Sequence, residues 1–525
     1  MRYVALFVLL VSRLWGEAAA ENADGEWARS VVQLSPFHVR AASGEFRFWG
    51  KYQTKNFTVY SDASGGTVED VALEMERLAA AFEVMFRHHP VALPRIVVVL
   101  PIASSDWRRL DASPGKEWLS AGAVCNVKPI TMVTISSDWQ RDRGPLRASV
   151  VRALMARADW AGPFWFTMGV GEVWSKVAVG RGSVVFRPDN NANMDLAHPE
   201  RWAETLNEQG WLPWREFGYV TNASNEFIEE AKVRRFLAQA AVLCHWLFWS
   251  GEGDHLDRVS RCRNQVVHGI APTDQVLGEL GVGRKNGSDP VHTHVNRLSA
   301  RKVEFEEQSA RFAVESVSVT AREMRELFVL AQLLSQRPGD TEAALEVFRV
   351  RAPRVPELRV LLAAAYLADG RRLEGYRALL EILPELKGRP EAATVAEAAA
   401  ELRFARLLPE VTLGSELSAE DAAQLQGWCE SALQIEPSLT TANRILAWTW
   451  ALGPRPPMGE LLGKFEMLRT NVGLRAGSAE IAAAEAVARL RAGDREGARQ
   501  IAVRLRQTSE APYFVPKLLA ALEKQ

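Results

Sequence analysis

Hydrophobic residues follow two different periods along this chain, and the change between them divides it. Up to about residue 320, short strand-like runs alternate with segments in which apolar residues recur at helical spacing. Arg95–Pro101 (RIVVVLP) is a continuous β-branched run, which is typical of a strand buried on both faces. Beyond Arg322 the residues are mainly Ala, Leu, Glu and Arg, and the helical period dominates. The pattern therefore predicts an α+β region followed by an all-α region.

The first region opens with a β-α-β-β order. Phe57, Val59 and Tyr60 predict a strand within Lys51–Asp62, and Thr67–His88 follows as a helix with a broad apolar face. Ala121–Ser136 supplies two further strands broken at Pro129, and the next helix opens at Leu146. Two later elements are predicted: a strand over Gly180–Pro188 and a long helix over Asn225–Trp249.

The second region contains an internal repeat of paired helices. Gly339 and Gly370 lie 31 residues apart, each between two helical segments. Ala432–Leu452 and Ala484–Leu505 have the same helix–turn–helix form. Such pairs stack on one another because neither helix buries its apolar face alone, so they predict a solenoid.

The chain between these regions is polar. Residues 284–297 contain Gly and Pro and are interpreted as a linker, and Val303–Thr320 predicts a pair of short strands. The predicted organisation is then as follows: signal peptide 1–20, N-terminal extension 21–50, α+β domain 51–283, linker with short strands 284–321, and helical repeat 322–525.

The N-terminus has the pattern of an export signal. Arg2 precedes an unbroken apolar run over Val4–Val11, and the small residues Ala18, Ala19 and Ala20 fit cleavage before Glu21. No segment reaches about 18 uninterrupted apolar residues, the length that a membrane-spanning helix needs. The prediction is an exported protein, periplasmic or extracellular, that does not span a membrane.

Net charge and cysteine usage narrow the function classes. A net charge of −1 argues against a nucleic-acid-binding face or a polybasic membrane patch. The four cysteines lack C-x-x-C spacing, which disfavours a structural zinc or redox motif. Two states remain open for Cys244 and Cys262: a disulfide bridge or buried free thiols.

Pro145–Ser175 has the outline of a zinc-peptidase site without its ligands. A thermolysin-like peptidase carries H-E-x-x-H on one helix and a third ligand, a Glu, on the next. Here two helical segments flank a Gly-Pro break, but no histidine occurs between His89 and His198.

Residues 51–283 resemble the secreted bacterial peptidase-MA-like proteins, a thermolysin-like (gluzincin) family often fused to tetratricopeptide repeats. The resemblance rests on NFTVYSD before a long helix, PFWF (Pro163–Phe166), the Gly169 to Trp174 segment, WLP (Trp211–Pro213), and the FLAQ and LCHWL runs of the long helix. It implies a zincin-like mixed sheet with helices, followed by a tetratricopeptide-like solenoid.

This chain differs from that family at the positions of the zinc ligands. The H-E-x-x-H position is expected within Val150–Arg157, where the chain reads VVRALMAR, and the third ligand is replaced by Met168 after Thr167. Without zinc or a nearby carboxylate there is neither water activation nor a general base, and Arg152 is always protonated. The resemblance implies a structural carboxylate at Glu172. We therefore predict no catalytic, metal-binding or cofactor-binding residue and no cofactor.

Other candidate groups have simpler interpretations. His245 is interpreted as a packing or hydrogen-bonding histidine and His292-x-His294 as an adventitious chelating pair. The remaining cluster, interpreted as a solvated loop or helix cap, consists of Glu252, Asp254, His255 and Asp257.

Two functions of different class follow from these patterns. The first is a non-catalytic exported protein, a pseudo-metallopeptidase domain joined to a helical scaffold that binds a protein or peptide. The alternative is a hydrolase with a relocated site built from Glu172, Asp159, His198 or His245. Metal content and peptide turnover separate the two.

Overall fold

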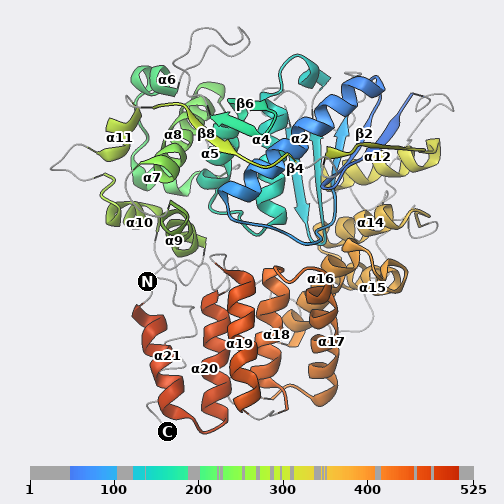
Figure 1. Ribbon diagram of the computed structural model, residues 1–525, viewed down its shortest axis with the longest axis vertical. Coiled ribbons are helices and arrows are strands. Elements are labelled where there is room, and N and C mark those ends of the chain that lie inside the picture. Colours follow the sequence, from blue (N-terminus) through green and yellow to red (C-terminus); the bar gives the residue numbers. More distant parts are fainter. Residues whose placement is uncertain are drawn as a thin grey trace, which may run out of the picture.

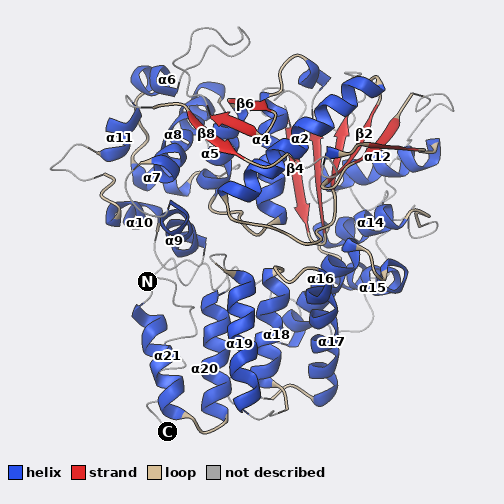
Figure 2. Ribbon diagram, viewed as in Figure 1, coloured by secondary structure: helices blue, strands red, loops and turns tan. Residues whose placement is uncertain are grey.

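A computed structural model shows a mixed α/β protein in which helices outnumber strands (Figures 1 and 2). The α/β part lies at the top of Figure 1, and an array of paired helices, α16–α21, lies below it. The structure describes residues 48–102, 122–135, 137–186, 202–221, 224, 229–250, 255–267, 272–283, 289–295, 298–307, 312–335, 345, 348, 352–407, 416–454, 458–473 and 478–507. The expected signal peptide lies outside these residues.

The main sheet has six strands in the order β4-β5-β3-β2-β1-β9. Strands β2, β3 and β5 run parallel, and β1, β4 and β9 are antiparallel to their neighbours. The strands are β1 (Gly50–Gln53), β2 (Phe57–Ser61), β3 (Ile96–Leu100), β4 (Gly122–Val127), β5 (Ile130–Ile135) and β9 (Glu315–Val317). The predicted β-α-β-β opening is confirmed, with Pro129 in the β4–β5 turn.

One face of the sheet is covered by helices of the α/β region. Alternate residues of β3 separate the two faces: Val98 belongs to the first core, whereas Val97 and Val99 belong to the second. The first core is formed with α2, α4, α5 and α8. The helices of this region are α2 (Gly65–Met85), η2 (Ser137–Gln140), α4 (Gly144–Arg157), α5 (Phe164–Ser175), α6 (Trp202–Gln209), α7 (Trp214–Tyr219), α8 (Glu230–Trp249), α9 (His255–Val267), α10 (Thr273–Glu279) and α11 (Pro290–His294).

The opposite face is covered by helices from the repeat region. Val97 and Val99 share a core with Leu327 of α12 (Ala321–Ser335) and Leu361 of α14 (Pro356–Ala368). Glu323 of α12 accepts hydrogen bonds from Lys51 Nζ and from the Tyr60 hydroxyl, both at 3.0 Å. The sheet therefore obtains its second hydrophobic layer from residues beyond 321.

The segment expected to be a linker is part of both sheets. β8 (Arg301–Glu304) pairs with β7 (Ser183–Phe186), which pairs with β6 (Val177–Gly180), and these three strands form a second sheet. β9 pairs instead with β1 of the main sheet. The expectation of two short strands in this segment is met, but they do not pair with each other. Each completes a sheet whose other strands come from much earlier in the chain.

The remaining helices form antiparallel pairs (Figure 1). They are α15 (Arg372–Ile382), η6 (Leu383–Leu386), α16 (Pro390–Leu407), α17 (Ala419–Ile435), α18 (Thr440–Leu452), α19 (Met458–Val472), α20 (Ser478–Arg491) and α21 (Arg495–Gln507). Gly370 joins α14 to α15 at φ 82° and Gly493 joins α20 to α21 at φ 87°. Glycine adopts this left-handed conformation without the steric cost of a Cβ, which allows the tight turn. Gly339 lies outside the described residues.

The array also contacts the α/β region directly. Leu93, which precedes β3, packs among Ala393, Ala396 and Ala442 of α16 and α18. The backbone N–H of Ala92 donates to the Glu436 carboxylate at 2.8 Å, in the turn between α17 and α18. The two regions thus share apolar and polar contacts, in addition to the helices that cover the sheet.

Candidate functional site

The site outlined by the sequence lies where α4 and α5 pack against each other. Pro145 stands in the first turn of α4, where its missing N–H has no cost, and α5 begins after Pro163. Gly169 lets α5 approach α8 closely, because a Cβ there would lie 2.4 Å from the carbonyl oxygen of Ala240. The backbone of α5 is therefore held between α4 and α8.

Arg152 of α4 occupies the space between the two helices. Its Nη2 donates to Ser149 Oγ at 2.9 Å, its Nε to the Ala148 carbonyl at 3.3 Å, and its Nη1 contacts Met168 Sδ at 3.4 Å. Gly171 leaves room for the stem of the arginine, since a Cβ there would lie 3.1 Å from Arg152 Cγ. A guanidinium and a thioether thus meet between α4 and α5, and neither is among the usual zinc ligands of proteins.

The charge of Arg152 has no carboxylate in direct contact among the described residues. Burial lowers the pKa of its guanidinium to about 10, and the charge of Glu172 opposes that shift. Glu172 itself accepts a hydrogen bond from Trp202 Nε1 at 3.3 Å. Arg152, Met168 and Glu172 all remain partly exposed, whereas Ser149 is fully buried.

The neighbours of the Arg152–Met168 pair on α4 lie earlier in the helix than most of the segment singled out by the sequence. The residues that contact the Arg152–Met168 pair are Ala148 and Ser149, which precede the expected Val150–Arg157 segment. Val150, Val151 and Leu154 are buried in the hydrophobic core. Residues one helical turn apart lie on the same face of α4. Which face meets α5 depends on where α5 crosses α4, and the sequence alone does not show that.

His245, expected to be a packing or hydrogen-bonding histidine, lies in a separate cluster with His292 and His294, the expected adventitious chelating pair. His245 Nδ1 and His294 Nε2 are 2.8 Å apart, and His292 stacks against Trp211 with ring centroids 4.0 Å apart. Burial lowers the pKa of His245 to about 3, with His294 and Arg301 contributing, so the imidazole is neutral at physiological pH. Among the described residues, no group of three His, Cys, Asp or Glu is arranged to hold a metal ion.

The groups of the alternative hydrolase site have different partners. Asp159 Oδ1 lies 4.0 Å from Lys128 Nζ, Glu172 bonds Trp202, and His245 bonds His294. His198 lies outside the described residues, as do Glu252 and Asp254. Asp257 pairs with Arg261 on α9, and His255 lies 3.2 Å from the Met85 carbonyl. Asp159, Glu172 and His245 are therefore not assembled into one site.

Three of the four cysteines are described in the structure, and each of these is a thiol. Cys244, Cys262 and Cys429 are free and buried. Burial raises the pKa of Cys262 to about 12, so this thiol is protonated and unreactive as a nucleophile at neutral pH. Of the two states left open for Cys244 and Cys262, the structure shows the free thiols.

Sequence reasoning missed a buried ionic cluster between the two regions. Lys128, in the β4–β5 turn, donates to Thr441 Oγ1 at 2.6 Å and lies 3.6 Å from Glu397 and 3.9 Å from Glu401 of α16. Burial opposes the charge of Lys128, but Glu397, Asp159 and Glu401 together raise its pKa above the ordinary value. Burial also raises the pKa of Glu397 to about 6, against the effect of Lys128. No spacing in the sequence signals this cluster, because Lys128 and its partners on α16 are distant in the chain.

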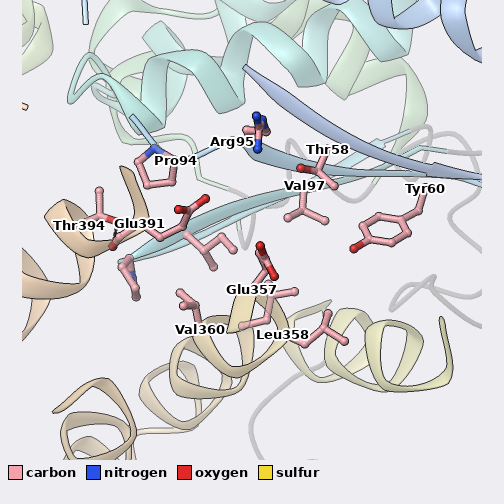
Figure 3. A pocket seen from close by; sticks show the side chains of 13 residues that line it. Thr58, Tyr60, Pro94, Arg95, Val97, Glu357, Leu358, Val360, Glu391 and Thr394 are labelled. Carbon is pink, nitrogen blue, oxygen red and sulfur yellow. Dashed lines mark hydrogen bonds between the residues drawn. The ribbon is translucent and has the colours of Figure 1, made fainter. Parts of the chain in front are cut away.

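A small cavity lies between the main sheet and the helices that cover it. Its walls bring Thr58 and Val97 of the strands opposite Glu357 and Val360 of α14, and Thr394 of α16 (Figure 3). The cavity volume is about 20 Å³, which is room for about one water molecule. Small-molecule sites are much larger, at about 300–1,000 Å³, so this cavity is an interior packing gap.

Comparisons with known proteins found no matching family model, no matching curated protein and no matching solved structure. Within the described part of the chain, every helix is too short or too polar to cross a bilayer.

Proposed function

We propose that this protein is a non-catalytic exported protein in which a degenerate metallopeptidase-like domain is joined to a helical-repeat scaffold that binds a protein or peptide. The observation that carries the proposal is the contact between Arg152 and Met168 at the crossing of α4 and α5. A zinc peptidase needs neutral imidazoles and a carboxylate at this place, and a fixed guanidinium repels a divalent cation.

The sheet supports a relationship to zinc peptidases of the thermolysin type. A mixed sheet with an antiparallel edge strand, β4, lies against α4, and α4 is followed by α5 after a short turn. In the register that we propose for the lost motif, Ala148, Ser149 and Arg152 stand for the first His, the Glu and the second His. Met168 then stands for the third ligand, and Glu172 follows one helical turn later.

The scaffold role is supported by the way the helices stack. Each helix from α16 to α20 packs on its neighbour, and α16, α18 and α20 also pack in sequence as one layer. Stacked helix pairs present extended surfaces on which other proteins bind. The apolar run and small residues at the N-terminus support export.

The metal content of the purified protein tests the loss of catalysis. We expect substoichiometric zinc by plasma mass spectrometry of protein prepared without chelator, and no turnover of casein or a peptide library. Stoichiometric zinc released by EDTA, or turnover abolished by Glu172→Ala, would contradict the proposal and favour the hydrolase.

Rebuilding the zinc-binding motif by mutation tests the proposed register. Ala148→His, Ser149→Glu, Arg152→His and Met168→Glu together place H-E-x-x-H on α4 and a glutamate on α5. We expect this variant to bind one zinc ion, and a control that keeps Arg152 to bind none. A folded quadruple variant without zinc would argue against a peptidase-like arrangement of α4 and α5.

The scaffold proposal is tested by deleting the last helices only. A protein ending at Leu452 keeps α12, α14, α16 and α18, which cover or contact the α/β region, and removes α19–α21. We expect capture of a partner from the native envelope fraction to be lost in this truncation and kept in Arg152→Met. A mature N-terminus at Glu21 in the exported fraction, measured by mass spectrometry, would support cleavage of the signal.

A further inference from the structure

Arg152 has hydrogen-bonding capacity that the fold does not use. A guanidinium carries five N–H donors. Three are directed at Ser149 Oγ, the Ala148 carbonyl and Met168 Sδ, one each from Nη2, Nε and Nη1. One N–H on each terminal nitrogen therefore has no acceptor among the described residues. Two N–H groups of one guanidinium can bind a carboxylate in bidentate fashion.

The acceptors that Arg152 does have are weak or neutral. A thioether is a poor hydrogen-bond acceptor, and a hydroxyl and a carbonyl carry no charge. Arg147 of the same helix differs, because its Nε donates to the Glu74 carboxylate at 2.6 Å. Removing a charge from water without a counter-ion is costly, so a ligand that supplies the missing anion would gain that interaction energy.

The surroundings restrict the kind of anion. Arg152, Met168 and Glu172 are each partly exposed, so this side of the crossing of α4 and α5 faces solvent. Glu172 acts on Arg152 through its charge and disfavours a doubly charged anion such as phosphate. The Met168 side chain offers an apolar contact to the carbon atoms that carry a carboxylate.

We propose that Arg152 binds the carboxylate of a ligand, with the C-terminal carboxylate of a peptide as the class that fits best. The anion would occupy the place beside α4 and α5 at which a peptidase would hold its metal ion. This proposal rests on the proposed function, because a metal ion at the same place would exclude the guanidinium.

Titration calorimetry on the full-length protein at pH 7 tests the proposal with four probes: acetate, inorganic phosphate, N-acetyl-Ala-Ala with a free carboxylate, and the same peptide as its amide. We expect the free-acid peptide to bind with a Kd of about 1 mM or tighter. The amide and phosphate should bind at least about tenfold more weakly, a difference of about 1.4 kcal/mol. Acetate binding as tightly as the peptide would also support the carboxylate site and identify small organic acids as the source.

The matched variants are Arg152→Met, which keeps the aliphatic stem, and Arg147→Met, which removes a paired arginine from the same helix. We expect the first to abolish binding of the free-acid peptide and the second to preserve it. Equal binding of acid and amide, tighter binding of phosphate, or retained binding in folded Arg152→Met would overturn the proposal. Absence of any peptide binding by metal-free wild-type protein would overturn it too, while leaving the proposed scaffold function intact.

Discussion

Lys128 and Arg152 are both partly buried cations, and the fold surrounds them differently. Lys128 lies within 4.0 Å of Asp159, Glu397 and Glu401, whereas Arg152 contacts a hydroxyl, a carbonyl and a thioether. The pKa of Lys128 is raised and the pKa of Arg152 is lowered, in keeping with these environments. A cation that joins two regions is compensated by the chain itself. Arg152 has no carboxylate in direct contact among the described residues, and this makes it the better candidate for contact with a ligand.

Removing Lys128 should have the largest effect on stability. Lys128→Met leaves the buried Glu397 without its closest cation, and we expect the free energy of unfolding to fall by about 3 kcal/mol. Urea denaturation, monitored by fluorescence, would measure this change in the free energy of unfolding. Lys302→Met, which breaks the exposed pair with Glu304, is the control and should change stability by less than about 0.5 kcal/mol. If Lys128→Met and Lys302→Met lowered the free energy of unfolding equally, the ion pairs of Lys128 would contribute no more to stability than an exposed pair.

The pH dependence of stability should identify Glu397. Its pKa in the folded protein is about 6, above the ordinary value of 4.5, so the folded state binds this proton more tightly. Its contribution to the free energy of unfolding is therefore present below pH 4.5, falls by roughly 2 kcal/mol as pH rises to about 6, and is constant above. Glu397→Gln should lose this slope, and Lys128→Met should move it to higher pH. If the free energy of unfolding of Glu397→Gln changed with pH as it does in the wild type, the pH dependence would come from other groups.

Gly171 tests whether Arg152 is held in place by close packing. In Gly171→Ala the new methyl would lie 3.1 Å from Arg152 Cγ, and we expect a loss of about 1 kcal/mol. A flexible stem can shift, so combining the change with Arg152→Ala should restore most of that loss. Additive effects in this double-mutant cycle would show that the glycine and the arginine do not interact.

Arg152→Met should have the smallest effect on stability. It exchanges an uncompensated charge for an apolar chain of similar length, which is neutral or stabilising by up to about 1 kcal/mol. The thermal midpoint measures this, with Arg147→Met as the destabilised comparison because it leaves Glu74 without one of its arginines. A strong destabilisation by Arg152→Met would indicate that the guanidinium serves the fold.

Much of the architecture follows from the sequence because local periodicity reports burial. The run around Val97, Val98 and Val99 predicts a strand covered on both faces, and both cores contain it. Paired helices with a left-handed glycine between them, as at Gly370 and Gly493, are equally visible in the sequence. The absence of histidine between His89 and His198 is also a property of the sequence alone.

Only the tertiary structure decided which elements meet. Periodicity shows that a face is buried but not what covers it, so the contribution of α12 and α14 to the sheet was not predictable. The pairing of β8 with β7 and of β9 with β1 depends on where the folded chain returns. The approach of Arg152 to Met168, and of Lys128 to Glu397, depends on how helices cross and on residues distant in sequence. Side-chain identity thus limits the chemistry that is available, and the packing of helices on strands selects which groups come into contact.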